Sequence, residues 1–173
     1  MIRRVAERYA VDPGRVFVIG LSNGGFMAHR LACDHADQVA AVVSLAGAQF
    51  ADKSACRPSR AVSVLQVHGT ADDTVLFGGG SIAGHPYPSA AETVGRWREL
   101  DHCSAQATMD PPLDAVAAIA GRETTRTSWG AGCTDGSEVA LWTVRGGPHV
   151  PEVTPSFTAA VVSWLEAHAR RSG

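Results

Sequence analysis

The sequence predicts an α/β fold with a mostly parallel sheet of about four strands flanked by helices. Four short runs rich in apolar and β-branched residues lie at 15–20, 39–45, 62–67 and 139–144, and helical patterns fall between them. Such runs are typical of strands in a sheet that is covered on both faces. Strands that alternate with helices pair in parallel, because each helix carries the chain back to the end of the sheet where the previous strand began.

The N-terminal segment predicts a helix, a turn and then the first strand. Ile2, Val5 and Tyr9 are spaced among charged residues as on one face of an amphipathic helix. No residue precedes this helix to cap it, which suggests a chain cut from something longer. The turn at residues 12–14 leads into residues 15–20, which we expect to be buried on both faces of the sheet.

Two further helices can be placed from the residues that begin them. Ser89 and Glu92 have the spacing of a capping box ahead of a helical apolar pattern. Thr154 can cap a second helix, with Pro155 at its first position. Loops are expected at residues 77–87 and over most of residues 104–112.

Composition and charge favour one globular domain spanning residues 1–173. With 45% hydrophobic residues, a chain of this length can bury a core. Lys and Arg total 15 against 17 Asp and Glu, and the net charge of -2 provides no basic surface for nucleic acid. No apolar run reaches the ~18 residues of a membrane span. Charges interrupt the N-terminus where a signal peptide would be continuously apolar, so we expect neither a signal peptide nor a membrane partner.

The four cysteines allow two disulfide bonds. Taken in order along the chain, the pairs would be Cys33 with Cys56 and Cys103 with Cys133, each stabilising the fold by ~3 kcal/mol. Four buried thiols are an equal alternative, because reduced cores also contain cysteine. Disulfides would indicate an exported protein. No Cys-x-x-Cys spacing supports a zinc or redox site, and we expect no metal and no cofactor.

Residues 20–24 fit the pattern Gly-x-Ser-x-Gly, with Ser22 at its centre. A predicted strand ends at Gly20 and a helical pattern begins just after Ser22, which is the arrangement of a nucleophile elbow. The small residues beside the serine permit a strained turn that raises its hydroxyl above the sheet. Ser22 is therefore the candidate nucleophile.

A serine nucleophile needs a histidine to take its proton, and seven histidines are present. In this kind of site the order along the chain is serine, acid, histidine, each on a loop after a strand. Only His149 comes after Ser22, after an acid, and on a loop that directly follows a predicted strand, the one at 139–144. The others fall on or beside predicted helices, after the glycine loop or, for His68, where a structural hydrogen bond is expected; they are His29, His35, His68, His85, His102 and His168.

The acid should follow the strand at 62–67, where Asp72 and Asp73 both lie. We prefer Asp72, because it is the first acid after the strand, and Asp73 remains the alternative. The acid would fix the tautomer of His149 and stabilise its protonated form. An aspartate in such a loop can also serve only to bond its own backbone.

Several segments together resemble the polyhydroxybutyrate depolymerase-like esterases, which are relatives of feruloyl and acetylxylan esterases of the α/β-hydrolase superfamily. The segments are Gly20-Leu-Ser-Asn-Gly-Gly, His68-Gly-Thr-Ala-Asp, Asp101-His-Cys, Gly132-Cys-Thr-Asp-Gly-Ser-Glu-Val-Ala-Leu-Trp and Gly146-Gly-Pro-His. The resemblance implies a secreted or periplasmic serine esterase acting on polyester or plant-wall esters, with Ser22, Asp72 and His149 at the triad positions. It also implies that the chain is the C-terminal part of an α/β-hydrolase, because the family has strands before the elbow strand.

The leading hypothesis is a serine ester hydrolase that works through an acyl-enzyme, on a small-molecule or polymeric ester. The backbone amide of Asn23 would donate to the oxyanion, and in this family a second donor comes from a loop before the elbow strand. The alternative is a truncated, catalytically impaired α/β-hydrolase fragment that acts as a binding or assembly module. Peptidase chemistry is a weaker third hypothesis.

An exposed sheet edge predicts self-association. The strand that begins at Arg15 and ends at Gly20 is expected to lie on an open edge, and it contains no lysine, proline or inward charge to discourage pairing. We expect a homodimer in which two copies of this strand pair antiparallel, giving one sheet of about eight strands.

Overall fold

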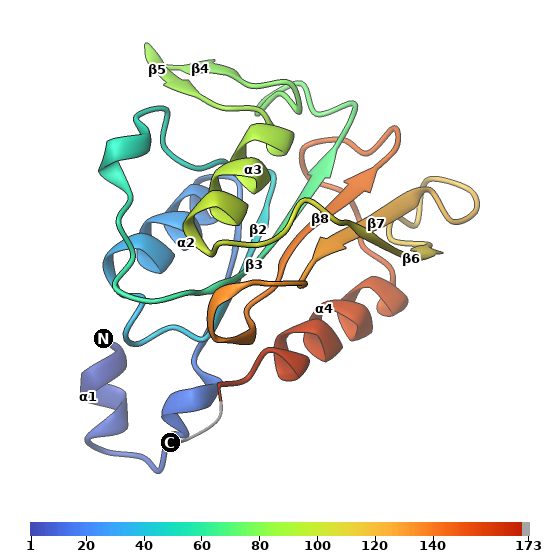
Figure 1. Cartoon of the computed structure of the whole chain (residues 1–173). Coiled ribbons are helices and arrows are strands. Elements are labelled where there is room, and N and C mark those ends of the chain that lie inside the picture. The colour runs from blue at the N-terminus through green and yellow to red at the C-terminus, as the bar shows by residue number, and fades with distance from the viewer. Residues whose placement is uncertain (171–173) are drawn as a thin grey trace.

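A six-stranded sheet forms the centre of the computed structural model, which describes residues 1–170 (Figure 1). The last three residues of the predicted 1–173 domain lie outside this range. The strands, in their order across the sheet, are β1 (Phe17–Leu21), β2 (Ala41–Leu45), β3 (Ser63–Gly69), β8 (Val139–Val144), β7 (Thr124–Trp129) and β6 (Thr108–Leu113). The first four are parallel, and β7 and β6 continue the sheet in antiparallel pairing. The predicted α/β class with a mostly parallel sheet is confirmed.

Helices cover both faces of this sheet. The α-helices of residues 1–170 are α1 (Ile2–Ala6), α2 (Asn23–Asp34), α3 (Ala90–Leu100) and α4 (Pro155–Ala167). Helices α2 and α3 lie on one face and α4 on the other, while α1 stands away from the sheet near the N-terminus (Figure 1). Of the helices within residues 1–170, none combines the length and the apolar character needed to cross a lipid bilayer.

The predicted helix starts are confirmed by their hydrogen bonds. The Ser89 hydroxyl accepts from the Glu92 amide and the Glu92 carboxylate accepts from the Ser89 amide, so both halves of the capping box are present. The Thr154 hydroxyl accepts from the Phe157 amide at the start of α4. These bonds satisfy amides that have no partner within a helix.

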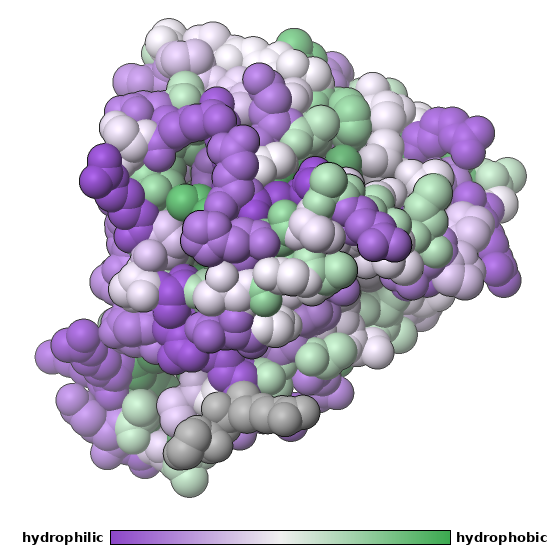
Figure 2. All heavy atoms as spheres, in the orientation of Figure 1, coloured by the Kyte–Doolittle hydropathy of each residue, from purple (hydrophilic) through white to green (hydrophobic). Residues whose placement is uncertain are grey.

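Two apolar layers hold the helices onto the sheet. Inward-facing residues of α2 and α3, among them Ala32 and Trp97, pack against Val64 on one face. On the other face Phe157 and Leu165 of α4 belong to a separate buried cluster. Figure 2 shows hydrophilic and apolar residues interspersed over the viewed surface. Burial of the apolar side chains in these two layers is the main force that stabilises the fold.

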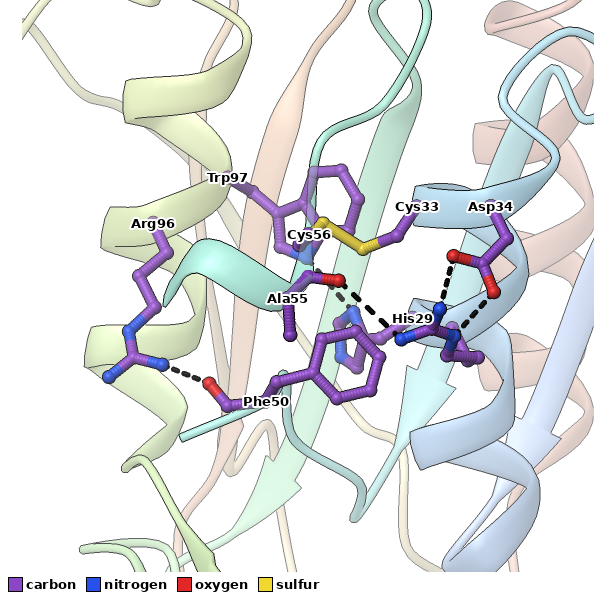
Figure 3. The surroundings of a disulfide bond; sticks show 9 residues. His29, Cys33, Asp34, Phe50, Ala55, Cys56, Arg96 and Trp97 are labelled. Atoms are coloured by element: carbon purple, nitrogen blue, oxygen red, sulfur yellow. Dashed lines mark hydrogen bonds and ion pairs between the residues drawn. A yellow bond between two sulfur atoms is a disulfide. The ribbon is translucent and has the colours of Figure 1, made fainter. Parts of the chain in front are cut away.

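Both predicted disulfides are present. Cys33 at the end of α2 is bonded to Cys56 (Figure 3), and Cys103 is bonded to Cys133. The first bond ties α2 to the segment between β2 and β3. The alternative of four free thiols is therefore wrong.

The sheet is larger than predicted because β6 and β7 join it, and a separate hairpin forms where a loop was expected. Residues 104–112, expected to be mostly loop, contain most of β6, whose two prolines are tolerated because it is an exposed edge strand. Residues 77–87 were expected to be a loop and instead hold a hairpin of β4 (Gly80–Ile82) and β5 (His85–Tyr87). Strand β7 was not predicted at all, although it contains several threonines.

Strand β1 lies at an edge of the sheet and pairs only with β2 in the part of the chain described. The expectation that it is buried on both faces is wrong, since Ile19 is 55% exposed and Leu21 is 39% exposed. The Ser22 amide donates to the Leu45 carbonyl. Because backbone groups alternate along a strand, the N–H and C=O of Ile19 and Leu21 point away from β2. This edge can therefore accept a further strand.

Pairing of two β1 strands stays a prediction, now between two six-stranded sheets. Sedimentation equilibrium at low micromolar concentration should give a dimer. Ile19→Lys should weaken the association, because a charge on an exposed edge opposes strand pairing. Val162→Lys is the control, since Val162 is a comparably exposed residue on α4. A well-folded monomer of the unmodified chain would contradict the prediction.

Candidate active site

Ser22 occupies the sharp turn between β1 and α2. Its backbone has φ 56° and ψ -118°, a conformation that residues other than glycine rarely adopt. A Cβ added to Gly20 would lie 2.0 Å from the carbonyl oxygen of Gly24, so the turn requires glycine at position 20. This is the strand, strained serine and helix arrangement that the sequence predicts for residues 20–24.

The start of α2 directs backbone amides toward the serine. Asn23 is the first residue of this helix, so its N–H has no acceptor within the helix. A helix N-terminus also carries partial positive charge. The Asn23 amide is thus suited to donate a hydrogen bond to an anionic oxygen beside Ser22.

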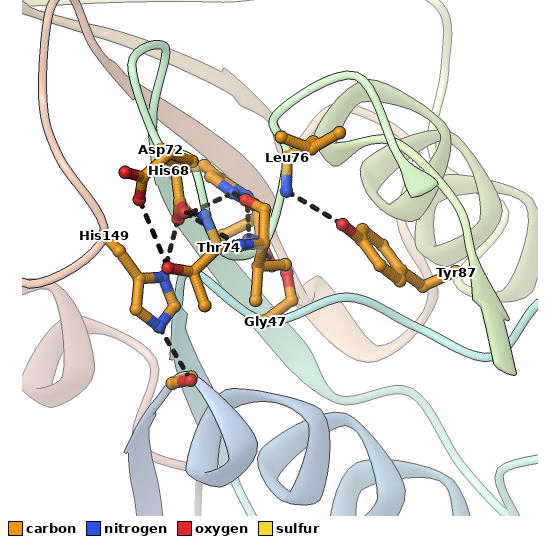
Figure 4. A network of polar contacts seen from close by, with 11 residues as sticks. Gly47, His68, Asp72, Thr74, Leu76, Tyr87 and His149 are labelled. Atoms are coloured by element: carbon orange, nitrogen blue, oxygen red, sulfur yellow. Dashed lines mark hydrogen bonds and ion pairs between the residues drawn. The ribbon is translucent and has the colours of Figure 1, made fainter. Parts of the chain in front are cut away.

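The structure brings Ser22, His149 and Asp72 into one hydrogen-bonded line (Figure 4). His149 Nε2 lies 2.8 Å from Ser22 Oγ, and His149 Nδ1 lies 2.9 Å from Asp72 Oδ2. An ionised carboxylate can only accept, so the proton on the imidazole belongs on Nδ1. Nε2 is then free to accept the proton of the Ser22 hydroxyl.

Backbone bonds fix the Asp72 carboxylate. Its Oδ1 accepts from the amides of Thr74 and Val75 at 2.9 Å and 2.8 Å, which leaves Oδ2 directed at His149. Asp72 is buried, whereas Asp73 is exposed and bonds only the Thr74 hydroxyl among the side-chain contacts of residues 1–170. The contact with His149 is made by Asp72 and not by the alternative, Asp73.

The loop that carries His149 is held against the end of β3. The Ala71 amide donates to the Gly147 carbonyl across the two loops. A Cβ on Gly69 would lie 2.1 Å from that same carbonyl oxygen, so the close approach requires glycine there. The two loops that carry the acid and the histidine are therefore held in close contact.

A cleft of about 620 Å³ opens beside Ser22. The hairpin β4–β5 forms part of its wall, and the Tyr87 hydroxyl accepts from the Leu76 amide to attach the hairpin to the loop after Asp72 (Figure 4). The ring of Tyr87 meets Phe26 edge to face, with centroids 5.8 Å apart. The lining is mainly aromatic and aliphatic, and its side chains include Phe26, Phe50, Val75, Ile82, Pro86 and Tyr87.

The cleft residues could not be predicted from the sequence, because they come from four separate segments that only the folded chain brings together. The same holds for a contact of His68, whose Nε2 lies 3.4 Å from Asp72 Oδ2. His68 and Asp72 are four residues apart, but this spacing predicts a contact only in a helix, and here His68 lies in β3 and Asp72 in the loop after it. The expected structural hydrogen bond of His68 is present, to the Val75 carbonyl at 2.7 Å.

The parallel sheet, its helices and the serine turn define this chain as an α/β-hydrolase. Its residues 2–113 match the phospholipase/carboxylesterase family, and the chain belongs to that family. The resemblance to esterases of this superfamily is thereby confirmed.

Curated relatives with similar sequences are esterases. Feruloyl esterase B of Piromyces equi is 26% identical over 86% of this chain and 27% of its own length. The putative esterase NocK of Nocardia uniformis is 35% identical over 88% of this chain and 47% of its own length. Feruloyl esterase D of Neurospora crassa is 29% identical over 87% of this chain and 45% of its own length. The chain thus spans a quarter to a half of the length of these relatives.

Solved structures share the fold. An acetyl xylan esterase from Aspergillus awamori superposes with a TM-score of 0.63 at 15% identity, covering 96% of this chain and 64% of that chain. A thermostable esterase gives a TM-score of 0.62 at 16% identity, over 98% of this chain and 35% of that chain.

The two aspartates give a direct test of which carboxylate orients His149. Asp72→Asn should lower turnover of an activated short-chain ester by up to about four orders of magnitude, because asparagine would favour the wrong tautomer of His149. Asp73→Asn is the matched control and should leave turnover close to that of the unmodified chain. Circular dichroism verifies that both variants fold. The reverse ranking would assign the role to Asp73.

Proposed function

We propose that this chain is a serine carboxylic-ester hydrolase in which Ser22 is the nucleophile, His149 the base and Asp72 the orienting acid. The observation that carries the proposal is the continuous line of contacts at 2.8 Å and 2.9 Å from Ser22 Oγ through His149 to Asp72 Oδ2. Similarity to named esterases adds support. The contact with His149 is decisive because a serine hydroxyl is a weak nucleophile unless a base lies within hydrogen-bonding distance.

In the first half of the proposed reaction, Ser22 Oγ attacks the carbonyl carbon of the ester while His149 Nε2 takes the hydroxyl proton. The electron pair of the carbonyl moves onto oxygen, where the Asn23 amide can stabilise the negative charge. When the tetrahedral intermediate collapses, the alcohol leaves and takes the proton from His149. An acyl-enzyme on Ser22 remains.

In the second half, water attacks the acyl-enzyme and His149 again takes the proton. Collapse of the second intermediate releases the carboxylic acid and returns the proton to Ser22 Oγ. Asp72 accepts from His149 Nδ1–H throughout and stabilises the imidazolium that forms in each half. The carboxylate stays ionised and is not itself protonated.

The cleft beside Ser22 favours an ester with an apolar or aromatic group. Its aromatic and aliphatic lining offers apolar contact, and one side is open to solvent, so a small molecule or the end of a polymer could enter. Polyester and plant-wall esters both satisfy this description. We include them as the proposed substrate class.

Both disulfides fit a protein of an oxidising compartment. Disulfide bonds persist outside the cytosol and are rare within it. We therefore propose a secreted or periplasmic location for the chain.

Covalent labelling tests the proposed nucleophile. A fluorophosphonate should modify Ser22, because a serine paired with a histidine base is unusually nucleophilic. Ser22→Ala and His149→Ala should both abolish labelling and the burst of product from an activated ester. His168→Ala is the matched control, since the His168 side chain is 13% exposed, as is that of His149, and His168 does not contact the serine.

Labelling at another residue of a folded sample would contradict this assignment. A folded sample that takes no label and gives no burst would favour a binding or assembly module instead.

A further inference from the structure

A line of buried polar side chains leads from α3 along one face of the sheet to the proposed acid. The Trp97 indole Nε1 lies 3.0 Å from His29 Nδ1, and His29 Nε2 lies 2.9 Å from Gln66 Oε1. Gln66 Nε2 lies 3.3 Å from His68 Nδ1, and His68 Nε2 lies 3.4 Å from Asp72 Oδ2. All five side chains of this line are buried. Gln66 and His68 both lie in β3, and the other three come from α3, α2 and the loop after β3.

The direction of this line is fixed at its first member. An indole N–H can only donate, so His29 must accept at Nδ1 and carry its proton on Nε2. His29 Nε2–H then donates to the amide oxygen of Gln66. Figure 3 shows the Trp97 and His29 side chains meeting between α3 and α2.

The carbonyl of Gly47 fixes the next member independently. Gln66 Nε2 lies 2.9 Å from this carbonyl oxygen, which can only accept. The amide group of Gln66 must therefore present its NH₂ to Gly47, and its second hydrogen points at His68 Nδ1. A rotated amide would bring two acceptors together at Gly47.

His68 is consequently held in one tautomer from both sides. Its Nδ1 accepts from Gln66, and its Nε2–H donates to the Val75 carbonyl, which is also an acceptor only. Burial lowers the pKa of His29 to about 4, and burial also lowers the pKa of His68. Both rings are therefore neutral near pH 7, so the position of the single proton decides what each can bind.

The Asp72 carboxylate lies beside two imidazole rings, those of His149 and His68. Asp72 Oδ2 lies 2.9 Å from His149 Nδ1 and 3.4 Å from His68 Nε2 (Figure 4). The loop after Asp72 is also held at both ends of Val75, whose amide donates to Asp72 and whose carbonyl accepts from His68. His68 thus contacts both the carboxylate and the segment that fixes that carboxylate.

We propose that His68 is a positioning residue for Asp72, held as the neutral Nε2–H tautomer by the Gln66 amide on one side and the Val75 carbonyl on the other. The proposal rests on the proposed function, because it assigns His68 a role through the acid that orients His149. The sequence alone predicts only a structural hydrogen bond for His68. A neutral His68 also keeps a second positive charge away from Asp72, where it would compete with the imidazolium of His149.

The tautomers can be measured without any activity. Nitrogen-15 and proton NMR of the ¹⁵N-histidine-labelled chain at pH 7 should show His68 and His29 neutral, each with its proton on Nε2. Single substitutions of each histidine assign the signals. A cationic His68, or one protonated on Nδ1 alone, would overturn the proposal whether or not the chain hydrolyses esters.

Kinetics test the positioning role. His68→Leu should lower kcat by about tenfold to a hundredfold, because a small displacement of a catalytic group has effects of this size. KM should change much less. His68→Gln keeps a donor near the position of Nε2 and should recover most of the lost kcat, which a purely structural role does not predict.

His29→Leu is the matched control, because His29 is equally buried and hydrogen-bonded but does not contact Asp72. It should lower the unfolding midpoint with little change in kcat. Equal losses of kcat in His29→Leu and His68→Leu would overturn the positioning role of His68. Full kcat in His68→Leu while Asp72→Asn is inactive would do the same. Neither outcome would contradict the proposed function. Absence of ester hydrolysis by the unmodified chain would count against the proposed function. The NMR measurement would then still test whether His68 is held as the neutral Nε2–H tautomer.

Discussion

Parallel pairing of β1, β2, β3 and β8 determines where the side chains of the candidate site lie. Leu21 is level with Leu45, Leu45 with Val67, and Val67 with Trp142, so the carboxyl ends of these strands meet at one edge of the sheet. Ser22, Asp72 and His149 each follow one of these ends within a few residues. The sheet therefore brings together three side chains that are far apart in the sequence, as open α/β sheets do for their ligands.

Close backbone contacts convert this approximate placement into hydrogen-bonding distances. Gly20 permits the serine turn, and Gly69 lets the loops carrying the acid and the histidine touch. A Cβ on Gly47 would lie 2.5 Å from the Gly25 carbonyl carbon, so the start of α2 is packed equally tightly. Such contacts leave little freedom to the groups on either side of Ser22, and preorganised groups are what catalysis of acyl transfer requires.

Much of this arrangement could be predicted from local signals, and the remainder depends on tertiary contacts. Strand β8 begins and ends where the apolar run predicts, and the cap at Ser89 forms as its spacing indicates. The cysteine pairs follow their order along the chain. Strand β6 could not be found, because its prolines oppose a strand and only pairing with β7 makes one. The contact of His68 with Asp72 likewise depends on how the loop after β3 folds back.

Acylation of Ser22, with His149 as base, is the step on which the proposed reaction depends. The most direct test of this step is to quench the reaction with acid within the first turnover of an activated ester and then to measure the masses of the peptides. The peptide that contains Ser22 should carry the added mass of the acyl group, and the same peptide of His149→Ala should not. An acyl group on another residue, or an unmodified Ser22 peptide during steady turnover, would contradict this prediction.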